Sequence, residues 1–397
     1  MTRASDLAKL LGAGGTLNAA LSVDTISEKT SGSGVTIDSL NVKDGGIGGH
    51  QIGGRRNIII NGAMQVAQRA TSATGISTSG YYTVDRMRIA SGSTAGRFTM
   101  TQESITDLSG FANAVKLDCT TADTSIAAGE LVTIGTRIEG QDLQQLKKGT
   151  SDAEKVTVSF YVKANASATY VFELYDNDNS RQISQSFSVT TSWSRVSLTF
   201  DGDTTGAFGD DNNLSLLLQI WLHAGSEYTS GTLSTSWSSV TAANRAVGIS
   251  SFFDSTDRTF FLTGLQMEVG EQATPFEHRS FGEELGLCQR YFQYLPAGSV
   301  GRWISSTTAE VCCNFPTLMR AVPTISINPN DNTCLIYRLG LSTNASTVSG
   351  ISSTYISESG GMVPLTVSST ASTPSTGDFA HYDTDGASEV VFCDSEL

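Results

Sequence analysis

Residues 155–200, KVTVSFYVKANASATYVFELYDNDNSRQISQSFSVTTSWSRVSLTF, decide the fold class of this chain. Four short runs, at 155–164, 170–176, 184–190 and 194–200, mostly alternate apolar with polar residues and are separated by turn-forming residues. Alternation with a period of two is typical of strands that bury one face and expose the other. Antiparallel sheets expose one face in this way, so the stretch predicts neighbouring strands of an antiparallel β-sandwich.

Runs of the same kind continue the pattern in both directions. We expect further strands at 57–60, 98–102, 114–119, 214–222 and 258–269, and a second set at 309–315, 324–329, 334–340 and 388–393. The Ser- and Thr-rich tract 341–377 is expected to form long surface loops. The chain is therefore predicted to be mainly β.

The length of the chain predicts more than one domain, because 397 residues exceed the roughly 250 that one hydrophobic core supports. We divide the chain into an N-terminal docking helix (1–20), a thin β shaft or linker (21–54), a jelly-roll domain (55–279), a short linking helix (280–296) and a C-terminal β-sandwich domain (297–397). The last domain, with its loop-rich tract, is the candidate receptor-binding tip.

The N-terminal segments are predicted to need partners. Leu7, Leu10 and Leu11 recur at helical spacing before a glycine stop, and a helix of two turns must dock on another protein surface. Residues 23–47 carry too few apolar side chains for a core of their own. A shaft that shares its core with two copies of itself solves this problem, so we expect a homotrimer; a flexible linker is the alternative.

The charge and the cysteines exclude several classes of protein. A net charge of −14 and a pI of about 4.7 argue against a nucleic-acid partner, which needs clustered Lys and Arg. The most apolar run, 214–222, is too short to cross a bilayer, and we see no targeting segment. The six cysteines lack metal-ligand spacing and are expected to be mostly buried thiols, with Cys312 and Cys313 on opposite strand faces.

Residues 274–292, TPFEHRSFGEELGLCQRYF, are predicted to form a joint between domains rather than an active site. Pro275 would hold the exit from the last jelly-roll strand extended. Ser280 and Glu283 form a capping-box pattern that starts a helix. The residues Phe281, Leu285, Cys288 and Phe292 then recur on one helical face, which would bind the two domains together.

Several stretches resemble tail-fibre and related virion structural proteins of tailed bacteriophages, which carry a jelly-roll domain similar to carbohydrate-binding modules. They are RRNIIINGAMQVAQRAT (55–71), YYTVDRMRI (81–89), VTVSFYVKANASATYVFELYD (156–176), TTSWSRVSLTFDGD (190–203) and FFLTGLQMEVGEQATPFEHRSFGEELGLCQRYF (260–292), with ISEKTSGSGVTIDSLNVKDG (26–45) resembling a short element of phage structural proteins. The resemblance implies a homotrimeric virion component, made in the host bacterial cytoplasm and attached by its N-terminus. It weakens in the last hundred residues.

Catalysis is not expected. The chain has four histidines and lacks the GxSxG, HExxH and P-loop motifs that mark common hydrolases and nucleotide-binding enzymes. A polysaccharide depolymerase, which needs two suitably spaced carboxylates, is the less favoured alternative. Tailspike enzymes generally resemble parallel β-helices with a repeat period that this chain does not show.

Binding is expected instead. Exposed aromatic and histidine side chains stack on sugars, and the receptor-binding candidates are Trp303, Tyr355, His381, Tyr382, Tyr228 and Trp237, although packing explains each of them as well; Trp193 and Trp221 are expected in the core. Asp176 and Asp178 are candidates for a structural calcium site, with solvated turns as the alternative, and no other cofactor is expected.

The sequence thus predicts a tail fibre that binds another virion protein through residues 1–54 and a host-surface glycan or receptor through its C-terminal part. The alternative is a purely structural virion component, such as a head fibre, a decoration protein or a tail adaptor.

Overall fold

The computed structural model describes residues 35–37, 40–43, 46–47, 50–51, 55–328, 333–338, 345–352, 355–367, 374–384 and 390–397. The chain divides into two compact units, Met1–Gly54 and Arg55–Leu397. In the first unit, β1 (Val35–Ile37), β2 (Leu40–Lys43), β3 (Gly46–Ile47) and β4 (His50–Gln51) form an antiparallel sheet in sequence order. The predicted docking helix, with Leu7, Leu10 and Leu11, lies outside the described residues.

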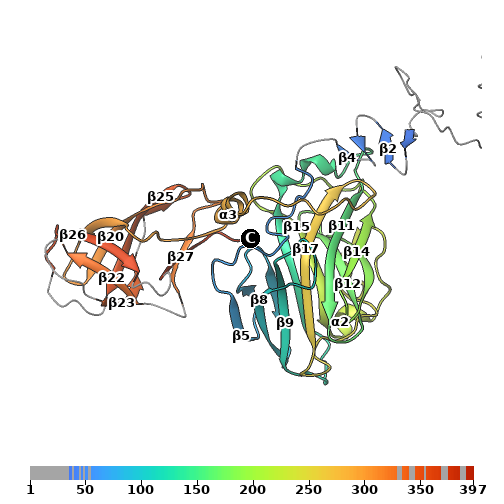
Figure 1. The fold of residues 1–397 in the computed structure, drawn as a ribbon, viewed down its shortest axis with the longest axis horizontal. Coiled ribbons are helices and arrows are strands. Elements are labelled where there is room, and N and C mark those ends of the chain that lie inside the picture. The colour runs from blue at the N-terminus through green and yellow to red at the C-terminus, as the bar shows by residue number, and fades with distance from the viewer. Residues whose placement is uncertain are drawn as a thin grey trace, which may run out of the picture. The chain divides into compact units, whose positions relative to one another are not determined.

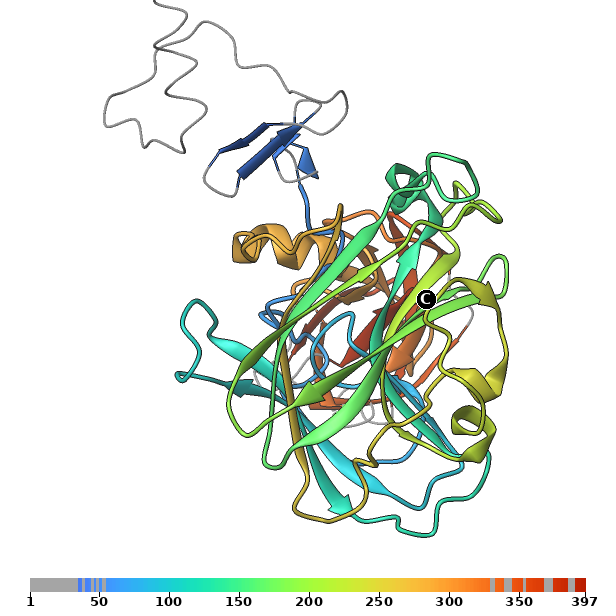
Figure 2. The same ribbon diagram turned by 90° about the vertical axis from the view of Figure 1, so that its right-hand side faces the viewer.

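The second unit begins with two antiparallel sheets (Figure 1). The first sheet has the order β14 (Ser194–Phe200), β11 (Val156–Ala164), β17 (Thr259–Val269), β9 (Asn113–Thr121), β8 (Arg97–Ser104) and β5 (Ser72–Ile76). The second sheet has the order β16 (Ser238–Ser239), β13 (Arg181–Val189), β12 (Ala168–Asp176), β15 (Leu214–Ala224), β10 (Leu131–Glu139), β7 (Arg88–Gly92) and β6 (Gly80–Tyr81). Figure 2 shows these strands, coloured from cyan to yellow, from a second side. The chain crosses between the sheets repeatedly, as in a jelly roll.

Apolar residues at alternate strand positions fill the space between these two sheets. Phe160 of β11 stacks on Phe172 of β12, with ring centroids 5.4 Å apart, and both are buried. The predicted core residue Trp221 is also buried, but on the other face of its sheet. Trp193 is only half-buried, because it packs edge-on against Phe261 outside the core, so its predicted core position is wrong.

The predicted strand at 57–60 is absent; side chains hold this segment instead. Asn57 Oδ1 accepts hydrogen bonds from the backbone amides of Ile59 and Met267, at 3.0 and 3.1 Å. Asn61 has a positive φ of 60°, and its side-chain amide bonds to the backbone oxygens of Val66 and Asp85. The side-chain amides of Asn57 and Asn61 thus supply hydrogen bonds that a neighbouring strand would otherwise supply. The apolar residues of the segment alone could not indicate this.

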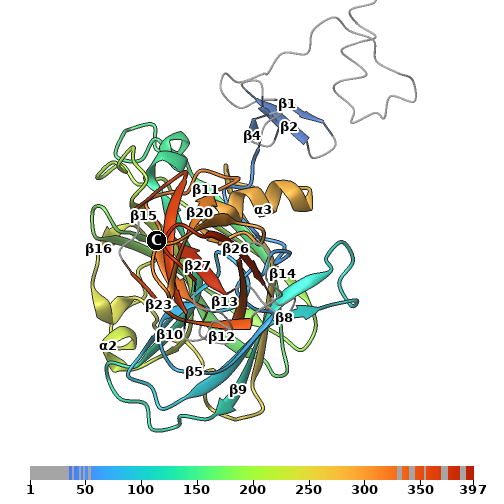
Figure 3. The same ribbon diagram turned by 90° about the vertical axis from the view of Figure 1, so that its left-hand side faces the viewer.

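The C-terminal strands close on themselves, which corrects the predicted second sandwich. Strands β20 (Thr308–Asn314), β19 (Val300–Trp303), β26 (Phe379–Thr384), β22 (Thr333–Arg338), β23 (Ala345–Ile351) and β25 (Gly360–Val367) pair in this order, and β25 pairs back to β20, with β24 (Tyr355–Ser357) beside β25 (Figure 3). A closed ring of this kind is a barrel. A smaller sheet with the order β18 (Phe292–Tyr294), β27 (Val391–Asp394) and β21 (Thr324–Ile327) completes the region.

The tract 341–377 was predicted to form surface loops, and this prediction is wrong for residues 345–367 as far as the structure describes them. Strands β23, β24 and β25 lie within it. Val348, Val363 and Leu365 fill the barrel interior with zero exposure, so sparse valines among Ser and Thr suffice for a small core. Cys312 and Cys313 are neighbours in β20 and were predicted to lie on opposite faces of a strand. This prediction is confirmed, since Cys312 is exposed and Cys313 is buried.

The described residues also contain the short helix α2 (Ser226–Thr229), the 3-10 turns Gly140–Asp142, Gln144–Leu146 and Ala242–Asn244, and helix α3 (Phe281–Gln289). Among these helices none is long and apolar enough to cross a membrane. Ser280 is the N-cap of α3, and its hydroxyl accepts a hydrogen bond from the Glu283 amide at 3.3 Å.

Helix α3 connects the sandwich to the C-terminal region, but the predicted apolar stripe is only partly present. Cys288 is buried and Leu285 is half-buried, whereas Phe281 is 57% exposed. Phe292 lies in β18 rather than in the helix. Pro275 lies at a bend of the segment between β17 and α3, which corrects the predicted extended exit. Burial raises the pKa of the Cys288 thiol well above its ordinary value, so the thiol is a poor nucleophile.

Charged side chains form several contacts at this joint. Glu139, at the end of β10, is fully buried and accepts hydrogen bonds from Arg290 at 2.6 and 2.9 Å and from the Tyr291 hydroxyl at 2.5 Å. On the same side of the sandwich, Arg86 pairs with Glu396. The joint is therefore a set of buried ion pairs between the sandwich and both ends of the C-terminal region.

Asp85 gives this joint a pH dependence. It is buried, and its carboxylate accepts hydrogen bonds from the Gln68 backbone and side chain at 3.0 and 2.5 Å. Burial raises the pKa of Asp85 from 3.8 to about 6, although Arg69 and the Gln68 hydrogen bonds act in the opposite direction. The folded chain then binds more protons than the unfolded chain between about pH 4 and pH 6. Over that window, Asp85 makes the free energy of unfolding fall as the pH rises.

We expect Asp85→Asn to remove this contribution, which amounts to a slope of at most about 1.4 kcal/mol per pH unit. Chemical denaturation of both proteins between pH 4 and pH 7 measures the slope. Parallel stability curves for the variant and the unmodified chain would show that Asp85 does not titrate in this range.

Candidate ligand-binding face of the sandwich

The second sheet has an outer face that points away from the core and carries polar side chains in register. Arg88 of β7 pairs with Gly135 of β10, Gly135 with Gln219 of β15, and Gln219 with Glu173 of β12. The intervening residues, such as Ile134 and Leu218, belong to the core. Because side chains alternate along a strand, this row lies on the outer face. A second row contains Arg137, Leu217 and Tyr175.

One half of the outer face is covered by residues 225–250. Glu173, fully buried there, accepts hydrogen bonds from Arg245 at 2.8 and 2.9 Å, from the Trp221 indole at 2.8 Å and from Gln219 at 2.6 Å. Tyr228 packs on Trp221 with ring centroids 5.1 Å apart. The carboxylate of Glu173 has its hydrogen-bond partners and its cation inside the chain. This half of the outer face is therefore a polar core and not a binding surface.

The other half of the outer face has a small depression over Gly135, with a volume of about 20 Å³. Its lining includes Arg88, Thr133, Arg137, Leu217 and Gln219. Gly135 must lack a side chain, since an added Cβ would lie 1.9 Å from the Leu218 carbonyl oxygen of the neighbouring strand. The depression has room for one hydroxyl or one acidic oxygen, while the remainder of a ligand would lie across the sheet. We call this depression the Gly135 groove.

Two guanidinium groups give the Gly135 groove a positive charge. Arg88 makes no ion pair with any carboxylate of the described residues. Arg137 donates a hydrogen bond to the Leu397 carbonyl, and its Nε is buried without a partner. Partial burial, followed by the repulsion of Arg88, holds the pKa of Arg137 below its ordinary value. An anion bound here would relieve the repulsion between the two guanidinium groups.

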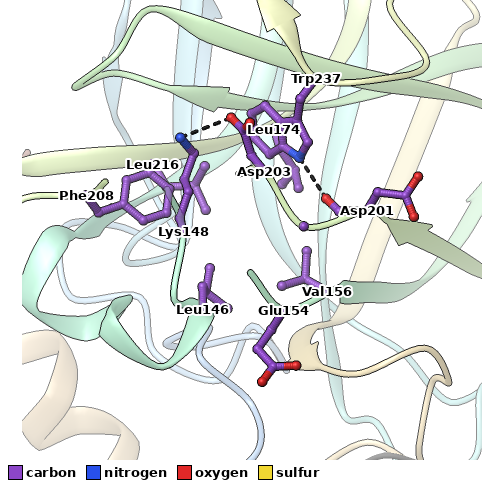
Figure 4. Close-up of a pocket in the computed structure, with 11 residues that line it drawn as sticks. Leu146, Lys148, Glu154, Val156, Leu174, Asp201, Asp203, Phe208, Leu216 and Trp237 are labelled. Atoms are coloured by element: carbon purple, nitrogen blue, oxygen red, sulfur yellow. Dashed lines mark hydrogen bonds and ion pairs between the residues drawn. The ribbon is translucent and has the colours of Figure 1, made fainter. Parts of the chain in front are cut away.

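A second pocket, also of about 20 Å³, opens at one end of the sandwich (Figure 4). Leu174, Phe208, Leu216 and Trp237 line it, and the Trp237 indole donates a hydrogen bond to the Asp201 carbonyl at 2.7 Å. Its volume is that of about one water molecule, so it cannot admit a sugar ring. Trp237, nominated for receptor binding, thus belongs to the wall of the sandwich.

The ammonium group of Lys148 lies beside this pocket and binds the nominated Asp176. Its Nζ is 2.6 Å from Asp176 Oδ2 and 3.1 Å from Asp203 Oδ2, and it donates to the carbonyls of Thr205 and Gly206. Asp178 accepts a hydrogen bond from the Gly209 amide at 2.9 Å. Asp176 therefore has a cationic partner within the chain, and Asp178 holds the loop that contains Gly209.

The aromatic receptor-binding candidates do not gather at one site. Trp303 and Tyr382 were predicted in exposed loops, but they are 1% and 0% exposed, because they fill the barrel interior. His381, in β26, is half-buried, and Tyr228 is held against Trp221. Tyr355 is 78% exposed on β24. Of the six candidates, Tyr355 alone has a largely free ring.

Sequence reasoning missed the residues of the Gly135 groove. Arg88, Gly135 and Gln219 are separated by many residues along the chain and meet only through the register of β7, β10 and β15. The alternation in residues 131–138, LVTIGTRI, was a usable signal for a strand with a polar outer face. Nothing in a single strand, however, indicates which strand lies beside it.

No protein-family model matches the sequence, and no curated protein matches it. Among solved structures, the enzymatically active domain of tailspike protein 4 from bacteriophage CBA120 is similar over 54% of this chain, with 10% identity and a TM-score of 0.28. This chain covers 21% of that domain. A CBM4 structure (53% of this chain, 97% of that chain, 10% identity, TM-score 0.28) and TmCBM61 in complex with β-1,4-galactotriose (54%, 99%, 8%, TM-score 0.27) are also similar. At these TM-scores, none of them assigns a fold or a function to the chain.

Proposed function

We propose that the chain is a bacteriophage fibre protein that attaches to the virion through residues 1–54 and binds a host-surface glycan without catalysis. The Gly135 groove is the observation that carries the binding part of this proposal. It combines hydrogen-bonding side chains and two guanidinium groups on the outer face of one sheet. The virion role, the homotrimer and the location of the protein in the virion rest on the sequence patterns described above.

The charge of the groove selects the class of glycan. The chain as a whole carries −14, so its surface repels anions except where cations gather. Arg88 and Arg137 form such a place, and a guanidinium group binds a carboxylate or phosphate through two parallel hydrogen bonds. The proposed ligand is therefore an acidic glycan, with the charged substituent over Gly135. In a trimer, three weak sites would act together and raise the overall affinity.

A purely structural virion component is the second candidate. Phe281, Leu318 and Val322 are 57%, 60% and 54% exposed, and exposed apolar side chains are typical of surfaces that bind another protein. In that case these residues would contact a neighbouring virion protein, and the groove would be unused.

We expect Arg88→Glu to abolish binding of acidic polysaccharide, with at least a tenfold loss of affinity, because a cation of the groove becomes an anion. The measurement is binding of the intact chain to an acidic polysaccharide and to a neutral one at low and physiological salt.

The solution mass of the same sample tests the trimer, which a monomer would contradict. The chain length of the polysaccharide after incubation tests the absence of catalysis, which shortened chains would contradict.

Lys147→Glu is the matched control, since it makes the same change of charge at an exposed lysine outside the groove. It should leave binding unchanged. If both variants lose the same affinity for the acidic polysaccharide, the cause is the net charge of the chain and not the groove. If Arg88→Glu still binds the acidic polysaccharide, the Gly135 groove is not the binding site.

A further inference from the structure

Three buried side chains with metal-binding groups meet at the end of the sandwich. Asp123 follows β9, Glu130 precedes β10, and His223 lies near the end of β15. They are 6%, 4% and 0% exposed, and one potential ligand atom from each lies within 4.8 Å of the others. Nothing in the glycan-binding proposal uses them.

The contacts of this cluster leave its charge unbalanced. Glu130 Oε2 lies 3.0 Å from His223 Nε2, and the carboxyl groups of Asp123 and Glu130 also contact each other. In the part of the chain that the structure describes, neither acid forms an ion pair with a lysine or an arginine. Two buried carboxylates in contact require a proton or a cation between them.

Hydrogen bonds fix the carboxylate of Asp123 in the cluster. Its Oδ2 accepts hydrogen bonds from the Thr94 hydroxyl and the Ala95 amide, at 2.9 and 2.8 Å. These donors orient the carboxylate, and neither of them brings a positive charge to the cluster.

His223 is held in the orientation of a metal ligand. Its Nδ1 lies 2.8 Å from Ser251 Oγ, and the ring packs edge-on against Phe253. A hydroxyl that accepts the Nδ1 proton leaves the lone pair of Nε2 directed at the two carboxylates. Ser251 then acts as a positioning residue for the imidazole.

We propose that Asp123, Glu130 and His223 bind a divalent transition-metal ion of the zinc type. One imidazole nitrogen and two carboxylate oxygens are a suitable donor set for Zn²⁺, with a fourth position left for water, whereas Ca²⁺ prefers oxygen ligands alone. Ligand atoms 4.8 Å apart surround a point at most about 2.8 Å away, so each would move inward by roughly 0.7 Å to reach a zinc bond of about 2.1 Å. The ion would tie the 122–130 connection to β15.

The test uses the full chain, stripped with a chelator and then titrated with Zn²⁺, Ca²⁺ or Mg²⁺. We expect one zinc per chain by elemental analysis and a higher melting temperature with Zn²⁺, but not with Ca²⁺ or Mg²⁺. Glu130→Gln keeps an acceptor for His223 and should lose stoichiometric zinc. Ser251→Ala should bind zinc about 10- to 100-fold more weakly.

His278→Gln is the control, because His278 packs against Phe111 and Phe276 away from the cluster. It should bind zinc as the unmodified chain does. The proposal is overturned if the stripped chain takes up no stoichiometric zinc and if neither zinc nor chelator changes its melting temperature. Asp123, Glu130 and His223 would then form a hydrogen-bond network that shares a proton.

Discussion

Replacing Lys148 by Met should lower the free energy of unfolding by about 3–5 kcal/mol, because it leaves buried carboxylates without their cation. The Lys148 side chain is 4% exposed, and its partners Asp176 and Asp203 are 0% and 3% exposed. After the substitution Asp203 retains Arg181, but Asp176 keeps only the amide hydrogen bonds of Asn179. Chemical denaturation of the purified variant measures the loss.

The adjacent lysine is the control for this prediction. Lys147 is 53% exposed and pairs with the half-buried Glu154, so Lys147→Met should leave the free energy of unfolding nearly unchanged. Adding Asp176→Asn to Lys148→Met should restore part of the stability, since it removes the unpaired charge. Equal effects at positions 147 and 148 would contradict the ion-pair account.

Replacing Glu139 by Ala should destabilise the joint by about 3–5 kcal/mol and separate the unfolding of the sandwich from that of the C-terminal region. Glu139 is fully buried, and its loss leaves Arg290 and the Tyr291 hydroxyl without their acceptor. We expect calorimetry to resolve two transitions, and a protease to cut the variant faster near α3.

Tyr291→Phe removes one of these hydrogen bonds and should have a smaller effect, about 1–2 kcal/mol. Glu271→Ala, at a 67% exposed acid paired with Lys155, should leave both the stability and the number of transitions unchanged. A single unshifted transition in Glu139→Ala would mean that other contacts hold the joint.

The strands of the sandwich were predictable because their signal is local. Residues 155–200 carry the alternation, the turns and the apolar faces in one stretch, and β11, β12, β13 and β14 lie within it. The helix at 281–289 was predictable for the same reason, since Ser280 and Glu283 lie three residues apart.

The closed barrel and the ligand-binding face depend on pairings that no local pattern encodes. Trp303 was nominated as an aromatic residue of the C-terminal region that could contact a receptor, but β19 lies between β20 and β26, and the ring fills the barrel. In the same way, Arg88 approaches Gln219 only across Gly135. Register between distant strands is set by the whole core, so the residues of the Gly135 groove could not be found from the sequence.

The pairing of β18 with β27 affects how the segment between these two strands could be exchanged between related proteins. Phe292 pairs with Asp394 and Tyr294 with Phe392, so the chain leaves for the barrel and returns from it at adjacent points. A segment whose two ends are neighbours is tolerated as an insertion, because its removal leaves a short gap to bridge. The residues between these two strands thus form an insertion whose two ends lie side by side, so we expect its replacement by another domain to leave the strands of the sandwich in place.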